Sequence, residues 1–238
     1  MKKETYEKIA VISIFAIAMA FLETVIVFYL RKLYYPAGFQ FPLTPISSFI
    51  LNIEWVREFF TIVMLLCVAF ITGKKFYERF AYFLYSFAIW DIFYYIWLKV
   101  LLDWPASLLT WDLLFLIPFP WLGPVLAPLI CSLTMIFLAL CILILQDKKK
   151  NNKLNLREWI LLVLGALIIQ YTFLYDFASL IIKNGLLSNC FDLMSNQKFL
   201  TLIYSYIPVY YNWLIFSIGE AIILLFIFLF IRRYFFNH

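Results

Sequence analysis

Six ionisable side chains of this sequence lie within or at the edge of long apolar segments. They are Glu23, Arg57, Glu58, Asp91, Asp176 and Glu220. Ionisable groups at membrane depth usually face the interior of a helix bundle or a wet cavity, and they often belong to the path of an ion, a proton or a ligand. We therefore predict an outward-opening, carboxylate-lined cavity that binds or transports a small cationic or protonatable solute.

Three of the acids share a spacing to a basic residue that follows them. Glu23 precedes Arg31 by eight residues, Asp91 precedes Lys99 by eight, and Asp176 precedes Lys183 by seven. In an α-helix this spacing places each carboxyl about 10–12 Å below a basic helix end. The matching depth predicts that the three acids supply negative field to one shared environment near the outer ends of their helices.

The other candidates are expected around that environment. Arg57 and Glu58 share one helix face with Glu54, at spacings of three and four residues. We expect Arg57 with Glu58 to shape or gate the site, whereas Glu54 alone is expected to be solvated or to face the lipid headgroups near the surface. Glu220 lies nearer the middle of its apolar segment, where it offers a deeper stop for a proton or a cation.

Three further interpretations use the same residues. The carboxyls are structural if they pair with Arg57 or Lys99, or if they stay protonated. The chain is an intramembrane hydrolase if Asp91 and Asp176 share a proton as acid and base. Tyr175-Asp176 resembles one half of the signature of intramembrane aspartyl proteases, although the companion Gly-x-Gly-Asp is missing. The third interpretation is an accessory or assembly subunit that packs against a larger membrane complex.

Motifs for cofactors and metals are scarce in this sequence. His238 is the only histidine, which argues against a haem site and against a histidine-rich zinc site. The four cysteines form no C-x-x-C pair. Glycine loops for phosphate, H-E-x-x-H, nucleophile elbows and dinucleotide fingerprints are also absent from the sequence. The sequence therefore names no cofactor and no metal.

Composition indicates the surroundings of these residues. Hydrophobic residues make up 66% of the chain and charged residues 14%, against roughly 25% charged in an ordinary soluble domain. Six apolar stretches reach the length of about 20 residues that spans a bilayer. These are 9–30, 53–73, 80–102, 125–146, 159–182 and 209–231. We predict an all-α, polytopic membrane helix bundle in which residues 1–238 form a single membrane-embedded domain.

The distribution of basic residues predicts the orientation. Thirteen lysines and arginines fall in the two terminal segments and in the second and fourth connections, and six fall on the other side. The excess predicts a multi-pass protein of the cell membrane with both termini in the cytoplasm. The lipid bilayer is the expected partner, together with a small cationic solute or another membrane subunit. No nucleic-acid partner is expected, because the basic residues form short clusters between apolar runs.

The outer connections, 31–52, 103–124 and 183–208, are long and apolar-aromatic, so we place the functional face there. The apolar piece 106–117 is too short to span, and we predict a re-entrant or interfacial helix. The acids of these connections are expected to cap helices or to face water; they are Asp103, Asp112 and Asp192.

Small residues share the helical stripe of each membrane acid, which predicts that these stripes face other helices. Ala16 and Ala20 accompany Glu23, Ala81 and Ala88 accompany Asp91, and Gly165 and Thr172 accompany Asp176. The spacing of Ala16 and Ala20 also resembles the Ala-x-x-x-Ala motif of the small substrate-binding subunits of energy-coupling-factor vitamin transporters. Those subunits are compact six-helix proteins with ligand loops outside.

Overall fold

Six long apolar helices dominate the computed structural model, which describes residues 1–117, 119–148, 153–185 and 197–236. Each is long and apolar enough to cross a membrane, as the sequence predicts. They are α1 (Lys3–Tyr34), α2 (Ser48–Thr72), α3 (Phe76–Leu102), α4 (Leu126–Asp147), α5 (Leu156–Lys183) and α7 (Trp213–Phe236). The chain thus has the architecture of a multi-pass membrane protein. The last helix begins at Trp213, four residues later than the predicted segment.

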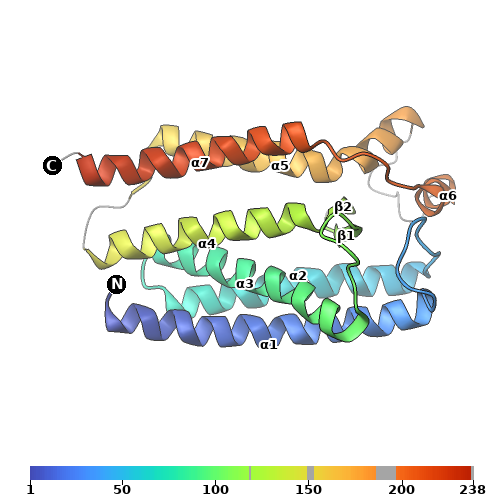
Figure 1. Ribbon diagram of the computed structural model, residues 1–238, viewed down its shortest axis with the longest axis horizontal. Helices are drawn as coiled ribbons and strands as arrows, with labels where there is room; N and C mark the ends of the chain where they lie inside the picture. The colour runs from blue at the N-terminus through green and yellow to red at the C-terminus, as the bar shows by residue number, and fades with distance from the viewer. Residues whose placement is uncertain (118, 149–152, 186–196, 237–238) are drawn as a thin grey trace.

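The helices form two layers, which Figure 1 shows one above the other. In the first layer α3 contacts α1, α2 and α4. In the second layer α5 and α7 pack against each other. Contacts between α4 and α7 join the two layers.

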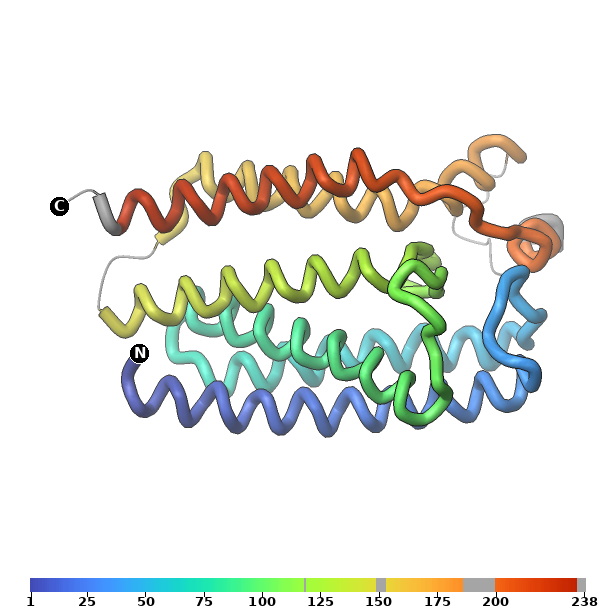
Figure 2. Tube along the Cα trace, viewed as in Figure 1, coloured from blue at the N-terminus to red at the C-terminus, as the bar shows by residue number. Residues whose placement is uncertain are grey.

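The two ends of the bundle differ in what they carry. The N-terminus, the turn from α2 to α3, the end of α4 and the C-terminal part of α7 lie at one end, which we call the basic end (Figure 2). The opposite end, which we call the hairpin end, carries two short strands and the helix α6 (Gln197–Ser205). The axis of α6 runs across the spanning helices (Figure 1). The start of α1 and the end of α7 lie at the same end of the bundle (Figure 1), and the cytoplasmic location of that end stays a prediction.

The segment 106–117 differs from the prediction of a short helix. It contains strand β1 (Trp111–Phe115), which pairs antiparallel with β2 (Trp121–Pro124). The pairing continues past the strands, because Val125 N donates to Thr110 O at 3.0 Å and Leu126 N donates to Leu108 O at 2.8 Å. Backbone groups of this segment therefore form hydrogen bonds with residues 121–126 and not within a helix of their own.

The hairpin contacts both helix layers. On the second layer, the Trp121 ring stacks on Phe173 of α5 with centroids 6.0 Å apart, and Trp111 meets Tyr211 edge to face at 6.0 Å. On the first layer Phe115 packs against apolar residues of α1, α2 and α3, and the polar contacts of the hairpin form part of the candidate site described below.

Small residues allow the helices to approach closely, as predicted. Ala16, Ala20, Ala81 and Ala88 are fully buried. Glycines allow a close approach between α5 and α7. A Cβ on Gly219 of α7 would lie 2.7 Å from Ile169 and 3.1 Å from the carbonyl oxygen of Gly165, so only glycine fits there.

Candidate functional site

Arg57 is the centre of a cluster of carboxyl groups near the hairpin end. Its guanidinium forms an ion pair with Glu23 of α1, and its Nη2 lies 2.8 Å from Glu54 Oε2 and 4.0 Å from Glu58 Oε1. Thr61 Oγ1 lies 3.3 Å from Glu23 Oε2 and 3.1 Å from the carbonyl oxygen of Arg57. We call these five residues the Arg57 cluster.

Helical spacing explains why the cluster forms. Glu54, Arg57, Glu58 and Thr61 are three or four residues apart on α2, so their side chains share one helix face. That face meets α1 at the depth of Glu23. The prediction that Glu54 is solvated is wrong, because its side chain is only 12% exposed and bonds Arg57 Nε at 2.8 Å.

The charges of the Arg57 cluster do not balance. Three carboxyl groups surround one guanidinium, and Glu23 and Glu58 are each 8% exposed. If all were ionised, the cluster would carry two negative charges without a partner. A buried site does not keep such an excess: a carboxyl takes up a proton, or a cation binds.

The Arg57 cluster is connected to the hairpin. Glu58 Oε2 accepts a hydrogen bond of 2.7 Å from the backbone N–H of Leu116, directly after β1. The same carboxyl group therefore faces Arg57 on one side and holds the hairpin on the other. A change in its protonation or in its cation partner alters the anchoring of the hairpin.

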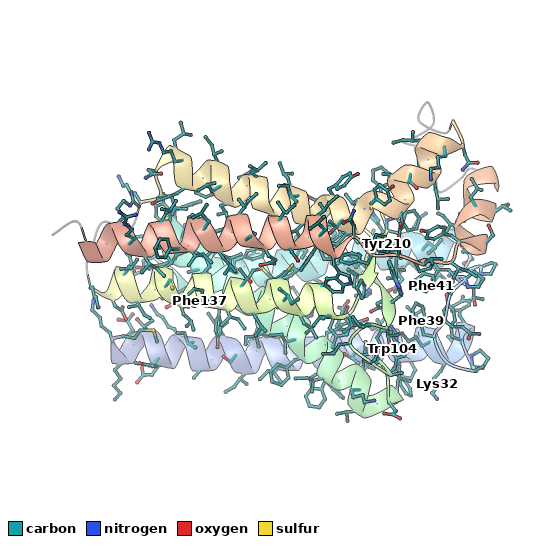
Figure 3. All side chains as sticks on the ribbon, turned by 45° about the horizontal axis from the view of Figure 1, so that its top comes forward. Lys32, Phe39, Phe41, Trp104, Phe137 and Tyr210 are labelled. Atoms are coloured by element: carbon teal, nitrogen blue, oxygen red, sulfur yellow. The ribbon has the colours of Figure 1, made fainter. Side chains whose placement is uncertain are left out.

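A second buried ion pair holds the other end of β1. Arg31 Nη2 of α1 lies 3.0 Å from Asp112 Oδ1, and Tyr95 OH of α3 donates to Asp112 Oδ2 at 3.4 Å. The Arg31 guanidinium lies over Trp104 at 3.8 Å and over Phe39 at 4.4 Å. Figure 3 shows these two aromatic residues together at the hairpin end.

Asp112 was expected to be a cap or a solvated group, and that expectation is wrong. Its side chain is buried, with 1% of the residue exposed. Burial raises the pKa of the carboxyl above its ordinary value, while the charge of Arg31 acts in the opposite direction. The sequence around Asp112 does not predict this ion pair, because Arg31 lies far away in the chain.

The other three candidate acids lie outside the Arg57 cluster. Asp91 of α3 accepts a hydrogen bond from Ser132 of α4 at 2.8 Å. Glu220 of α7 accepts one from Thr134 of α4 at 2.9 Å, and it also interacts with the thiol of Cys131. Asp176 of α5 bonds the hydroxyl of Tyr206. Each of these acids therefore has its own hydrogen-bond partner outside the Arg57 cluster.

The structure thus brings together Glu23, Arg57 and Glu58 among the six predicted site residues. Asp91 and Asp176 have different hydrogen-bond partners, on α4 and after α6, so a proton shared between them stays a prediction. Lys99, considered as a partner of Asp91, instead pairs with Asp103 at 2.7 Å.

Metal-ligating side chains are dispersed over the described part of the chain. Within it, no three histidine, cysteine, aspartate or glutamate side chains lie together in a way that would hold a metal ion.

Comparisons with protein-family models, with curated proteins and with solved structures found no significant match to this chain.

Proposed function

We propose that the Arg57 cluster binds a small cationic or protonatable solute that enters from the hairpin end. The observation that supports this proposal is the charge excess: three carboxyl groups, two of them buried, surround a single arginine. A cationic solute would supply the missing positive charge. The proposal includes a cavity that opens outward beside these groups, with the hairpin end on the outer side of the membrane.

The roles of the residues follow from their contacts. Arg57 holds Glu23 and Glu54 in place, so these two carboxyls set the negative field. Glu58 is the responsive group, because its second oxygen is the acceptor for Leu116 N–H. When the solute pairs with Glu58, the hydrogen bond to the hairpin weakens. The hairpin then acts as the moving part of the site.

We extend the proposal from binding of the solute to its transport. Asp91 and Glu220 each face α4, through Ser132 and Thr134. They provide further carboxyl positions at which a proton or cation would stop on its way toward the basic end. Binding at the Arg57 cluster and movement past Glu220 are separable, and each has its own measurement.

The binding proposal is tested on purified protein in lipid nanodiscs with methylammonium and butylammonium, and with Na⁺ and K⁺ for comparison. We expect wild type to bind at least one of these ions, as detected by calorimetry and by the infrared band of protonated carboxyl groups. Glu54→Gln and Glu58→Gln should each abolish binding. Asp103→Asn removes an exposed acid and should bind like wild type.

Two results would contradict the proposal. Wild type that binds none of the four ions would reject a cationic ligand. Equal loss in Asp103→Asn and in the two glutamate variants would reject the Arg57 cluster as the binding site. Transport is then measured with proteoliposomes, in which Glu220→Gln should stop uptake while binding at the Arg57 cluster persists.

A further inference from the structure

A polar cavity lies at the basic end, opposite the candidate site. Its volume is about 720 Å³, within the range of about 300–1,000 Å³ typical of small-molecule sites. The start of α1, the turn from α2 to α3 and the end of α4 form its walls, and Figure 2 shows these segments together. Five lysines line it: Lys2, Lys8, Lys74, Lys75 and Lys153.

The three acids of the cavity are used to hold its walls together. Glu78 accepts hydrogen bonds from Lys74 N at 2.8 Å and from Gln146 at 3.1 Å, which joins the turn to α4. Asp147 accepts from Lys2 N at 2.7 Å and from Thr5 at 2.8 Å, which joins α4 to α1.

Glu4 is the third acid, and it pairs with two of the lysines. It lies 2.9 Å from Lys8 and 3.8 Å from Lys74. The ammonium groups of Lys2, Lys75 and Lys153 form no ion pair with any residue in the described ranges. The five lysines and three acids of the lining therefore leave a net charge of +2.

Two helices also begin at this cavity. Lys2 and Lys75 are the N-cap residues of α1 and α3, and neither side chain caps its helix. The free N–H groups and the helix dipole make a helix start favourable for an anion. Two helix starts and a net charge of +2 around one cavity favour a compact ligand with more than one negative charge.

We propose that this cavity binds a phosphate group through Lys2, Lys75 and Lys153. Phosphate has the charge and the acceptor oxygens that such a set of donors requires. The group is supplied either by the headgroup of an anionic phospholipid or by a soluble phosphate compound. Basic pockets of this kind, at the membrane surface between transmembrane helices, suit lipid headgroups. The proposal does not depend on the function of the Arg57 cluster.

The test uses the full chain and a charge-matched control. The cavity variant is Lys2→Gln/Lys75→Gln/Lys153→Gln. The control is Lys3→Gln/Arg157→Gln/Arg232→Gln, which removes three exposed charges from the same end outside the cavity. The probes are dioctanoyl phosphatidic acid, dioctanoyl phosphatidylglycerol and dioctanoyl phosphatidylcholine, and, as soluble compounds, inorganic phosphate and pyrophosphate. Binding is measured by native mass spectrometry and by the shift of thermal unfolding.

We expect the cavity variant to bind its phosphate probe at least about tenfold more weakly than wild type, and the control to change less than about twofold. Binding of the two anionic lipids alone identifies a headgroup site, and binding of phosphate or pyrophosphate identifies a site for soluble phosphate compounds. The proposal is overturned if wild type binds none of the anionic probes. Equal weakening in both variants also overturns it, because surface charge would then suffice.

A second measurement covers the case in which the cavity variant does not fold. Amine-reactive labelling of wild type is read by mass spectrometry with and without the probe that gives the largest stabilisation. Lys75 should be protected by the probe, whereas Lys3 should label equally in both samples. Equal labelling of Lys75 would reject the cavity as the site.

Discussion

Asp112 provides the counter-charge for a guanidinium that has little contact with water. Arg31 is 7% exposed and faces two aromatic rings, so its charge depends on this carboxylate. Removing one partner of a buried ion pair leaves the other charge uncompensated, which costs about 3–5 kcal/mol.

We therefore predict that Asp112→Asn lowers the free energy of unfolding by about 3–5 kcal/mol. Asp103→Asn should leave it unchanged, since Asp103 pairs with Lys99 in the open. Thermal unfolding of both variants in one detergent measures the difference. The double variant Arg31→Met/Asp112→Asn should recover part of the loss, because the unpaired charge is then gone. Equal stability of Asp103→Asn and Asp112→Asn would contradict this account.

The sequence predicts residues of the Arg57 cluster better than it predicts the Asp112 pair. Glu23, Arg57 and Glu58 stand out because they interrupt or border apolar helices. Asp112 lies in a connection, and its partner Arg31 is 81 residues away, so only the folded chain brings the two together. The sequence does not predict the burial of Glu54, because its hydrogen bond with the Arg57 side chain is seen only in the folded structure.

Glu58 of α2 holds the β-hairpin at the end of β1. Glu58→Ala removes the acceptor for Leu116 N–H, whereas Glu58→Gln keeps an oxygen at the same place. We predict faster amide hydrogen exchange over residues 111–117 in Glu58→Ala, by at least about tenfold, and near-wild-type exchange in Glu58→Gln. Exchange in α5 serves as the internal reference. Unchanged exchange at Leu116 in Glu58→Ala would show that the hairpin is held by its other contacts alone.

The contact between α5 and α7 depends on Gly165 and Gly219. Any side chain at Gly219 would overlap Ile169 and approach the Gly165 backbone, so we predict that Gly219→Leu separates the two helices. The measured result should be a lower midpoint of thermal unfolding. Ser217→Leu, at an exposed position of the same helix, should keep the wild-type midpoint. A similar midpoint for both variants would contradict close packing at Gly219.

At the scale of elements, helices are predictable and the hairpin is not. The six spanning segments are long and apolar. In lipid, a helix is the simplest conformation in which all their backbone N–H and C=O groups have hydrogen-bond partners. The segment 106–117 is a short apolar run, and periodicity cannot separate a buried strand from a helix in such a run. Its conformation depends on pairing with 121–126, which is a tertiary property.

The whole molecule has a basic end and a hairpin end, and its orientation is a prediction from the basic residues. In a variant without native cysteines, single cysteines are introduced at Lys3 and at Leu108. Both positions are exposed, and they belong to opposite ends of the bundle. We expect a membrane-impermeant maleimide to label position 108 in intact cells and position 3 only after lysis. The reverse pattern would place the Arg57 cluster on the cytoplasmic side.

The pairing of α5 with α7 also bears on how the protein is made. Helices α1 to α4 are consecutive and pack on one another, so they are able to associate while later segments are still being synthesised. The principal partner of α5 comes last, and Arg233 of α7 reaches back to Glu158 at the start of α5, at 2.9 Å. Until α7 is inserted, α5 stays in the bilayer with its glycine face uncovered and with Glu158 lacking its arginine partner. A ribosome stalled between α5 and α7 would thus leave a half-finished bundle in which the glycine face of α5 has no partner helix.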